Sequence, residues 1–190
     1  MKIVVILNNV RSSENVGSIF RTADAALVSK IFLCGYTPAP VDRFGRENKG
    51  LTKASLGAEK FVKWEKVDNL SIAIKSLQNY SSAYVSECTD IFLLKNSSCL
   101  PQSGSQGVHQ HMHLNNFTIV GIEQNKKAID YRKIKSNKTK NIALIFGNEV
   151  DGLSKEELKL CDLIAQIPMH GQKESLNVAV CAGVVLYSLL

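Results

Sequence analysis

The stretch ESLNVAVCAGVVLYSLL, residues 174–190, places the strongest constraint on the fold of this chain. Its polar side chains gather at the start, where Ser175 and Asn177 stand two positions apart. The apolar run that follows is shorter than the roughly 20 residues that a helix needs to cross a bilayer. We therefore expect a helix that begins near Ser175 and is buried in the core of the protein, with polar groups at its entrance.

Short runs rich in Val and Ile precede this segment, and such runs are typical of strands buried on both faces of a parallel sheet. The predicted strands are Lys2–Leu7, Ile31–Cys34, Phe117–Ile122, Ile142–Phe146 and Leu163–Ile167, with a further candidate at Phe61–Trp64.

Helical patterns lie between these runs. Val16–Leu27 and Leu70–Leu77 carry apolar residues at helical spacing, and Ser154–Glu157 is a capping-box pattern that starts another helix. The charged stretch Val41–Lys60 is predicted to be a loop with a short helix. Because strands and helices alternate, the sequence indicates an α/β fold with a mainly parallel sheet flanked by helices.

The length of the chain predicts a single domain covering residues 1–190. Residues 96–116 are rich in Ser, Gln, Gly and His, so we expect a surface insertion there. His109, His111 and His113 alternate within it. They would share one face of a strand, but the insertion contains no acidic residue and its one cysteine, Cys99, is ten positions before His109, so no metal site is expected.

Charge and cysteine content limit the partners and the compartment. The net charge of +6 and the pI near 9.1 favour a polyanionic partner, nucleic acid before a membrane surface. The five cysteines include no C-x-x-C pair, so neither a disulfide framework nor a zinc site is indicated. The first residues, MKIVVILNNV, lack the length and cleavage signal of a secretory peptide. We expect a cytoplasmic protein with no membrane partner.

Three loops that follow predicted strands carry functional side chains, and the second and third also carry glycines. They are Asn8–Asn15 (NNVRSSEN), Gly147–Gly152 (GNEVDG) and Pro168–Glu174 (PMHGQKE). Ligands of parallel α/β sheets bind beyond the carboxyl ends of the strands, so these loops are the candidate site. None of them contains a G-x-G-x-x-G or Walker pattern, so a dinucleotide or nucleoside triphosphate site of the usual kind is not supported.

Longer motifs around the same loops occur in a recognisable order. They are NVGSIFRTADA (Asn15–Ala25), LIFGNEVDGLS (Leu144–Ser154) and IPMHGQKESLNVAV (Ile167–Val180), with DRFGR (Asp42–Arg46) and KASLGAE (Lys53–Glu59) between the first two. Together they resemble the motifs of the SpoU (TrmH-like) family, which belongs to the SPOUT superfamily of RNA methyltransferases.

This resemblance implies a fold and an activity. The fold would have a deep trefoil knot, formed by a C-terminal segment that threads through a loop. The activity would be transfer of a methyl group from S-adenosyl-L-methionine to a ribose 2'-hydroxyl of tRNA or rRNA, with no DNA substrate. The active unit would be a homodimer.

The resemblance also implies roles for individual residues. Arg21 would be catalytic and act across the dimer interface, Asn15 would help to place it, and Glu149 would shape the site. The cofactor would be held by Gly147, Ile167, Met169, Ser175, Leu176 and Asn177.

Two basic clusters are candidates for RNA contact, because lysine and arginine neutralise phosphates without reading sequence. The candidate RNA-binding residues are Arg43, Arg46, Lys53, Lys126, Lys127, Arg132 and Lys133.

Other interpretations of the same residues remain open at this point. The main alternative is a catalytically inactive, knotted RNA-binding protein, and another is a regulatory α/β domain that binds a metabolite. Arg21 can also be read as a surface ion-pair partner, Glu149 as a loop cap, and Asn15 and Ser175 as helix caps.

Overall fold

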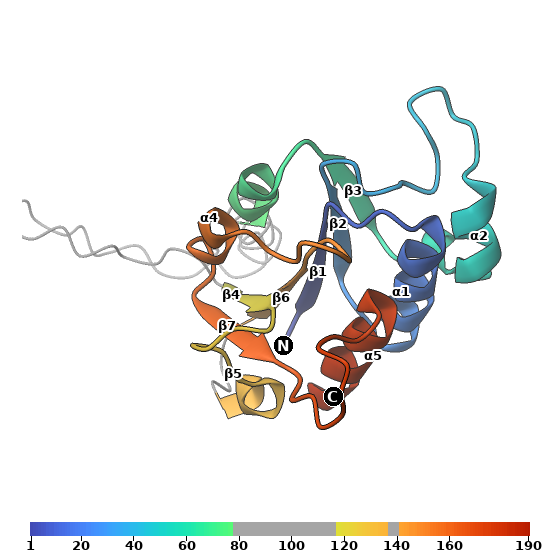
Figure 1. The fold of residues 1–190 in the computed structure, drawn as a ribbon. Coiled ribbons are helices and arrows are strands. Elements are labelled where there is room, and N and C mark those ends of the chain that lie inside the picture. Colours follow the sequence, from blue (N-terminus) through green and yellow to red (C-terminus); the bar gives the residue numbers. More distant parts are fainter. Residues whose placement is uncertain (78–116, 137–140) are drawn as a thin grey trace, which may run out of the picture.

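The computed structural model describes residues 1–77, 117–136 and 141–190. Within these residues the strands form one sheet in the order β3-β2-β1-β6-β4-β7-β5, and every pair of neighbours is parallel (Figure 1). The strands are β1 (Ile3–Asn8), β2 (Lys30–Cys34), β3 (Trp64–Val67), β4 (Phe117–Ile122), β5 (Ile129–Asp130), β6 (Asn141–Phe146) and β7 (Leu163–Gln166). The predicted α/β architecture with a parallel sheet is confirmed.

Helices cover both faces of the sheet. The α-helices are α1 (Ser13–Ala25), α2 (Lys49–Ser55), α4 (Lys155–Leu158), α5 (Val178–Ser188) and a helix over residues 70–77; η1 (Ala58–Lys60) and η2 (Tyr131–Ser136) are 3-10 helices. Figure 1 shows α1, α2 and α5 on one side of the sheet and α4 on the other. One core joins α1 and α5 to the sheet, and a second core joins the helix over 70–77 and α4 to the opposite face.

The central strand β1 shows why these apolar runs become strands. It pairs with β2 on one side and with β6 on the other, so that Ile6 lies between Phe32 and Ile145. All six of its residues are buried, because a parallel sheet covered on both faces leaves neither side of the strand to water.

The C-terminal helix α5 is buried on one face only. Val178, Ala182, Val185 and Leu186 are buried, whereas Val180 and Tyr187 on the opposite face are 53% and 56% exposed. The predicted start of this helix near Ser175 is wrong.

The helix α5 begins at Val178, and Asn177 is its N-cap. The Asn177 Oδ1 accepts from the backbone N–H groups of Ala179 and Val180, at 2.9 and 3.4 Å. These N–H groups have no acceptor inside the helix, so the helix begins directly after the residue whose polar side chain accepts from them. Ser175 therefore lies outside the helix and does not cap it.

Two other predicted boundaries need correction. The first helix runs over Ser13–Ala25 rather than Val16–Leu27, because Ser12 caps it and Leu27, at φ 53°, has left the helix and is 87% exposed. Since Ser12 is the cap, Asn15 is not. The strand predicted at Phe61–Trp64 instead covers Trp64–Val67, because Phe61 ends a 3-10 turn and is 78% exposed.

Some predictions fall on parts of the chain that the structure does not describe. The insertion over residues 96–116, with His109, His111 and His113, lies outside the described residues. Among the residues that are described, no helix is both long and apolar enough to cross a membrane.

Candidate functional site: a cavity at the carboxyl ends of the central strands

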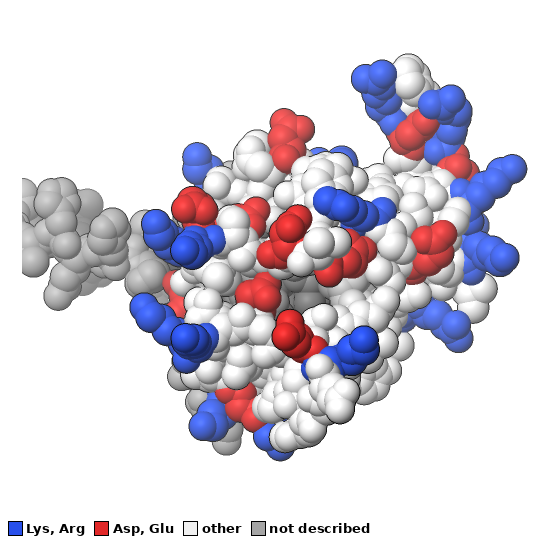
Figure 2. Space-filling view, viewed as in Figure 1, with Lys and Arg blue, Asp and Glu red and all other residues white. Residues whose placement is uncertain are grey.

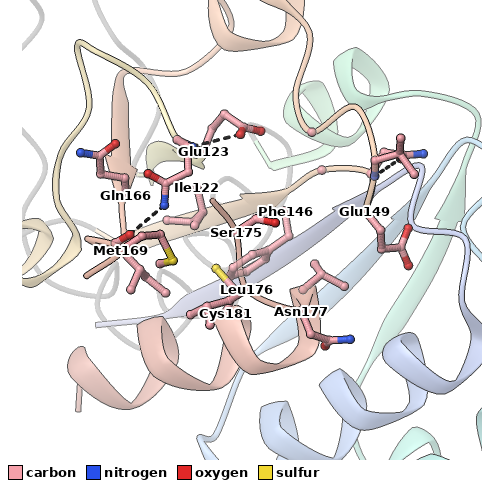
Figure 3. A pocket seen from close by; sticks show the side chains of 17 residues that line it. Ile122, Glu123, Phe146, Glu149, Gln166, Met169, Ser175, Leu176, Asn177 and Cys181 are labelled. Atoms are coloured by element: carbon pink, nitrogen blue, oxygen red, sulfur yellow. Dashed lines mark hydrogen bonds between the residues drawn. The ribbon is translucent and has the colours of Figure 1, made fainter. Parts of the chain in front are cut away.

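A cavity of about 340 Å³ lies beyond the carboxyl ends of β4, β6 and β7, against the start of α5 (Figure 3). Segments far apart in the sequence form its wall. The lining residues are Ile122, Glu123, Gln124, Phe146, Gly147, Asn148, Glu149, Val150, Gly152, Gln166, Ile167, Met169, Ser175, Leu176, Asn177, Val178 and Cys181.

All six residues predicted to hold a cofactor line this cavity. Gly147 follows β6, Ile167 and Met169 follow β7, and residues 175–177 lead into α5. Glu149 also lines it. The position follows from topology, since parallel strands deliver their following loops to the same edge of the sheet.

A chain of hydrogen bonds joins three loops at the rim of the cavity. The carboxylate of Glu149 accepts from the backbone N–H groups of Arg11 and Ser12, at 2.9 and 3.1 Å. It also accepts from the Nδ2 of Asn15, at 3.1 Å. The Oδ1 of Asn15 in turn accepts from the Nδ2 of Asn177, at 3.0 Å. The rim is therefore held by contacts between residues 134 or more positions apart.

These donors also control the charge of Glu149. Partial burial acts to raise its pKa, but the N–H groups of Arg11 and Ser12 and the amide of Asn15 outweigh this and hold the pKa below its ordinary value. The side chain is therefore a carboxylate at neutral pH. The thiol of Cys181, by contrast, has its pKa raised to about 12 by burial, so this wall of the cavity offers no thiolate nucleophile.

The Gly147–Gly152 loop folds back on itself where it borders the cavity. A Cβ added to Gly147 would lie 2.5 Å from the carbonyl carbon of Gly152. The buried Asn148 closes the turn, since its Oδ1 accepts from the N–H groups of Val150 and Asp151, at 2.7 and 3.2 Å. Its Nδ2 donates to the carbonyl of Asn9, at 3.1 Å, which ties the loop to the segment after β1.

Sequence reasoning missed Glu123 and Gln124. The Oε2 of Glu123 accepts from the backbone N–H of Leu153, at 2.7 Å, and the Nε2 of Gln124 donates to the carbonyl of Ile167, at 2.7 Å. These side chains hold the other two loops in place. Both residues directly follow the predicted strand Phe117–Ile122, so the rule that selected the other three loops also applied to them.

The charge of the cavity wall favours a cation. Glu123 and Glu149 line it, and none of the described lining residues is a lysine or an arginine. Figure 2 shows acidic side chains gathered around the hollow in the middle of this face. Apolar side chains also line it, among them Ile122 and Phe146. A part-apolar ligand that carries a positive charge, such as a sulfonium nucleoside, fits this wall.

Arg21 does not line the cavity of its own chain. It is exposed on α1, one position before Thr22. A Cβ added to Gly183 of α5 would lie 3.8 Å from the Cγ2 of Thr22, so Arg21 lies close to where α1 meets α5.

The two basic clusters lie toward opposite ends of the sheet. Arg43, Arg46 and Lys53 are exposed in the segment that follows β2, whereas Lys126, Lys127, Arg132 and Lys133 surround β5 at one edge. Two of these cations also have acidic neighbours, since the Nε atoms of Arg46 and Arg132 lie 2.7 and 2.8 Å from carboxylate oxygens of Asp42 and Asp130. Within one chain the structure does not bring the two clusters together.

No cluster of three or more His, Cys, Asp or Glu side chains suited to a metal occurs in the part of the chain that the structure describes.

The fold and the cavity define a class of protein: a parallel α/β domain with a ligand site built from three loops and the start of the last helix. A family model described as the SpoU rRNA Methylase family matches residues 2–93 and 103–187. The chain belongs to this family.

Known relatives cover nearly all of this chain. A tRNA (guanosine(18)-2'-O)-methyltransferase of Aquifex aeolicus is 28% identical over 97% of this chain and 67% of its own length. A 23S rRNA (guanosine-2'-O-)-methyltransferase RlmB of Xylella fastidiosa is 28% identical over 97% of this chain and 57% of its own length. The chain thus spans 57–67% of the length of these two relatives.

Solved structures share the fold. The TrmH/SpoU tRNA-modifying enzyme of A. aeolicus has a TM-score of 0.68 and 25% identity, with 99% of this chain and 73% of that chain covered. An AdoMet-bound rRNA methyltransferase of Sinorhizobium meliloti has a TM-score of 0.66 and 25% identity, with 99% of this chain and 55% of that chain covered.

Proposed function

We propose that this protein transfers a methyl group from S-adenosyl-L-methionine to a ribose 2'-hydroxyl of tRNA or rRNA. The observation that carries the proposal is the rim of the cavity, where Glu149, Asn15 and Asn177 from three separate motifs are joined by hydrogen bonds. The names of the relatives support the reaction and the RNA substrate. The presence of these residues in one connected rim favours an active enzyme over an inactive RNA-binding protein.

The cavity is proposed to hold the cofactor. The backbone at Gly147, Ile167 and Leu176 binds its adenosine part, with Met169 beside it and Ser175 and Asn177 at the entrance. A solved rRNA methyltransferase of S. meliloti with the same fold is bound to AdoMet, which supports the choice of cofactor. The chemistry supplied there is an electrophilic methyl group on a sulfonium, and the carboxylates of Glu123 and Glu149 favour that positive charge.

Arg21 is proposed to act on the ribose hydroxyl. A guanidinium offers only hydrogen-bond donors and a positive charge, so its simplest role is to orient the hydroxyl and to stabilise the negative charge that develops on the oxygen. Asn15 shares a helix with Arg21 and bonds to the cavity rim, so it helps to set the position of that helix.

The active unit is proposed to be a homodimer. Val180 and Tyr187 leave an apolar face of α5 uncovered, and Leu176 and Leu190 add exposed apolar surface before and after the helix. Arg21 is absent from the cavity of its own chain and lies near this apolar face. It is therefore proposed to act at the cavity of a second copy of the chain that packs against this face. The trefoil knot implied by the family resemblance, and the cytoplasmic location expected from the cysteine usage, are part of the same proposal.

The proposed function is tested by incubating the purified chain with S-adenosyl-L-[methyl-³H]methionine and with tRNA and rRNA from cells that lack the gene. We expect label in one of the two RNA classes, at a ribose that resists alkaline cleavage on its 3' side. RNA that binds without any transfer of label would instead support the inactive RNA-binding alternative.

Glu123→Gln is expected to weaken binding of the positively charged S-adenosylmethionine relative to binding of its uncharged thioether product. Glutamine keeps an oxygen for the N–H of Leu153 but removes the negative charge. Affinity for S-adenosylmethionine should fall about two- to fivefold, the range for partly exposed charge pairs, while affinity for the uncharged thioether S-adenosylhomocysteine stays the same. Calorimetry on both ligands measures this. Glu156→Gln, on α4 outside the cavity, is the matched control, and equal losses for both ligands would refute a charge effect.

A further inference from the structure

Loop 41–47, between β2 and α2, holds an aromatic ring out in solvent. Phe44 is 68% exposed and belongs to neither core of the protein. Two guanidinium groups accompany its ring, since the Cζ atoms of Arg43 and Arg46 lie 4.7 and 5.2 Å from the ring centroid. Figure 2 shows this loop as a projection at the upper right that carries basic side chains.

The loop holds this shape through its own hydrogen bonds. The Oδ1 of Asp42 accepts from the backbone N–H groups of Phe44 and Arg46, at 2.8 and 2.9 Å, and its Oδ2 accepts from the Nε of Arg46, at 2.7 Å. Gly45 takes a φ of 78°, which favours glycine, and a β-bridge between Val41 and Glu47 closes the base. The ring is thus presented by a preformed turn, and a ligand that binds it has little ordering cost to overcome.

A second exposed ring lies between this loop and the cavity. Tyr36 is 55% exposed and borders the same open hollow as Arg43, Phe44 and Arg46. Its hydroxyl is hydrogen-bonded to the side chain of Asn148, which lines the cavity. The Cζ of Arg11 lies 6.0 Å from its ring centroid. Aromatic and guanidinium groups therefore follow one another from the loop tip to the candidate site.

We propose that Phe44, together with Arg43 and Arg46, is a stacking platform for an unpaired nucleobase of the substrate RNA. This inference rests on the proposed function and specifies how the RNA is held. Every base has a π-face, so an exposed ring binds bases with little regard to sequence, while adjacent guanidinium groups neutralise phosphates. Bases inside a duplex are already stacked on one another, so the platform favours single-stranded or splayed-out nucleotides.

The test compares binding of fluorescently labelled RNA, single-stranded and duplex, by anisotropy. Phe44→Leu keeps an apolar side chain but removes the π-face, so it should weaken binding of the single strand about fivefold or more, with little change for the duplex. Phe44→Trp keeps a π-face and should bind the single strand about as tightly as the wild type. RNA should also quench the tryptophan fluorescence of Phe44→Trp more than that of the wild-type chain, in which Trp64 gives the signal. The salt dependence should keep its slope in Phe44→Leu and lose part of it in Arg43→Gln.

The matched control is Phe61→Leu, since Phe61 is 78% exposed. Equal RNA affinity in Phe44→Leu and Phe61→Leu would overturn the platform. A change in oligomeric state in Phe44→Leu would show that the ring contacts a second copy of the chain instead, and would also overturn it. Unchanged binding of S-adenosylmethionine shows that the variant is folded. If the wild-type chain methylates RNA but the platform variants bind normally, only this inference fails; if the wild type binds no RNA, the proposed function fails with it.

Discussion

Arg21→Ala is expected to slow methyl transfer by roughly 10²–10³-fold, the usual cost of removing a group that stabilises charge in the transition state. Affinity for S-adenosylmethionine should stay nearly unchanged, because Arg21 is not among the residues that line the cavity of its own chain. Single-turnover transfer rates and calorimetric binding separate the two effects. Arg21→Lys should recover little activity, since an ammonium lacks the planar donor fork of a guanidinium.

A mixing experiment decides which chain Arg21 serves. Arg21→Ala leaves the cavity intact, whereas Glu149→Ala damages the cavity rim but keeps Arg21. If Arg21 acts on the partner's cavity, co-expressed mixed dimers regain one complete site and part of the activity. If the mixture stays as inactive as its components, Arg21 does not act across an interface. Normal turnover by Arg21→Ala alone would remove Arg21 from the reaction.

Gly147→Ala is expected to abolish cofactor binding and to destabilise the protein by about 1–3 kcal/mol, the range for an overpacked site. The new Cβ would meet the carbonyl carbon of Gly152 at 2.5 Å and the nitrogen of Leu153 at 2.8 Å. These are backbone atoms, so a change of side-chain rotamer cannot relieve the clash, and the loop that carries Glu149 must move. Denaturant unfolding and calorimetry measure the two effects.

Gly171→Ala is the matched control for this substitution. Gly171 lies in the loop after β7, where an added Cβ has nothing within 4 Å, and its φ is not in the left-handed region. We expect its stability and cofactor affinity to match those of the wild type. If Gly147→Ala bound S-adenosylmethionine as tightly as Gly171→Ala does, the cavity described above would not be the cofactor site.

The strands were the most predictable elements. Runs such as Phe117–Ile122 and Ile142–Phe146 are buried on both faces, so their apolar character is continuous and visible in the sequence. Helix ends were less predictable, because several polar residues compete for the same free N–H groups. Both Ser175 and Asn177 are suitable caps, and only the path of the chain into α5 selects Asn177. Strand β3 was misplaced because Phe61 is apolar but exposed.

The candidate site was predictable in part. Glycines and polar groups directly after strands marked the loops at Gly147–Gly152 and Pro168–Glu174, and family resemblance suggested their roles. The same signal occurs directly after Phe117–Ile122, where the polar residues Glu123 and Gln124 follow the strand. The position of Arg21 outside the cavity of its own chain left no trace in the local pattern, because exposure of one helical residue depends on what packs against the helix.

By itself the sequence determined the parallel α/β class, the strands and the loops that can carry a site, because these depend on local hydrophobic patterns and on residue chemistry. Only the tertiary structure decided that Glu149, Asn15 and Asn177 meet in one hydrogen-bonded rim, and that Glu123 and Glu149 line one cavity whose described lining residues include no lysine or arginine. The physical reason is separation along the chain. Hydrogen bonds and charge pairs act over a few ångströms, and residues more than a hundred positions apart come within that range only when the sheet order brings their loops to one edge.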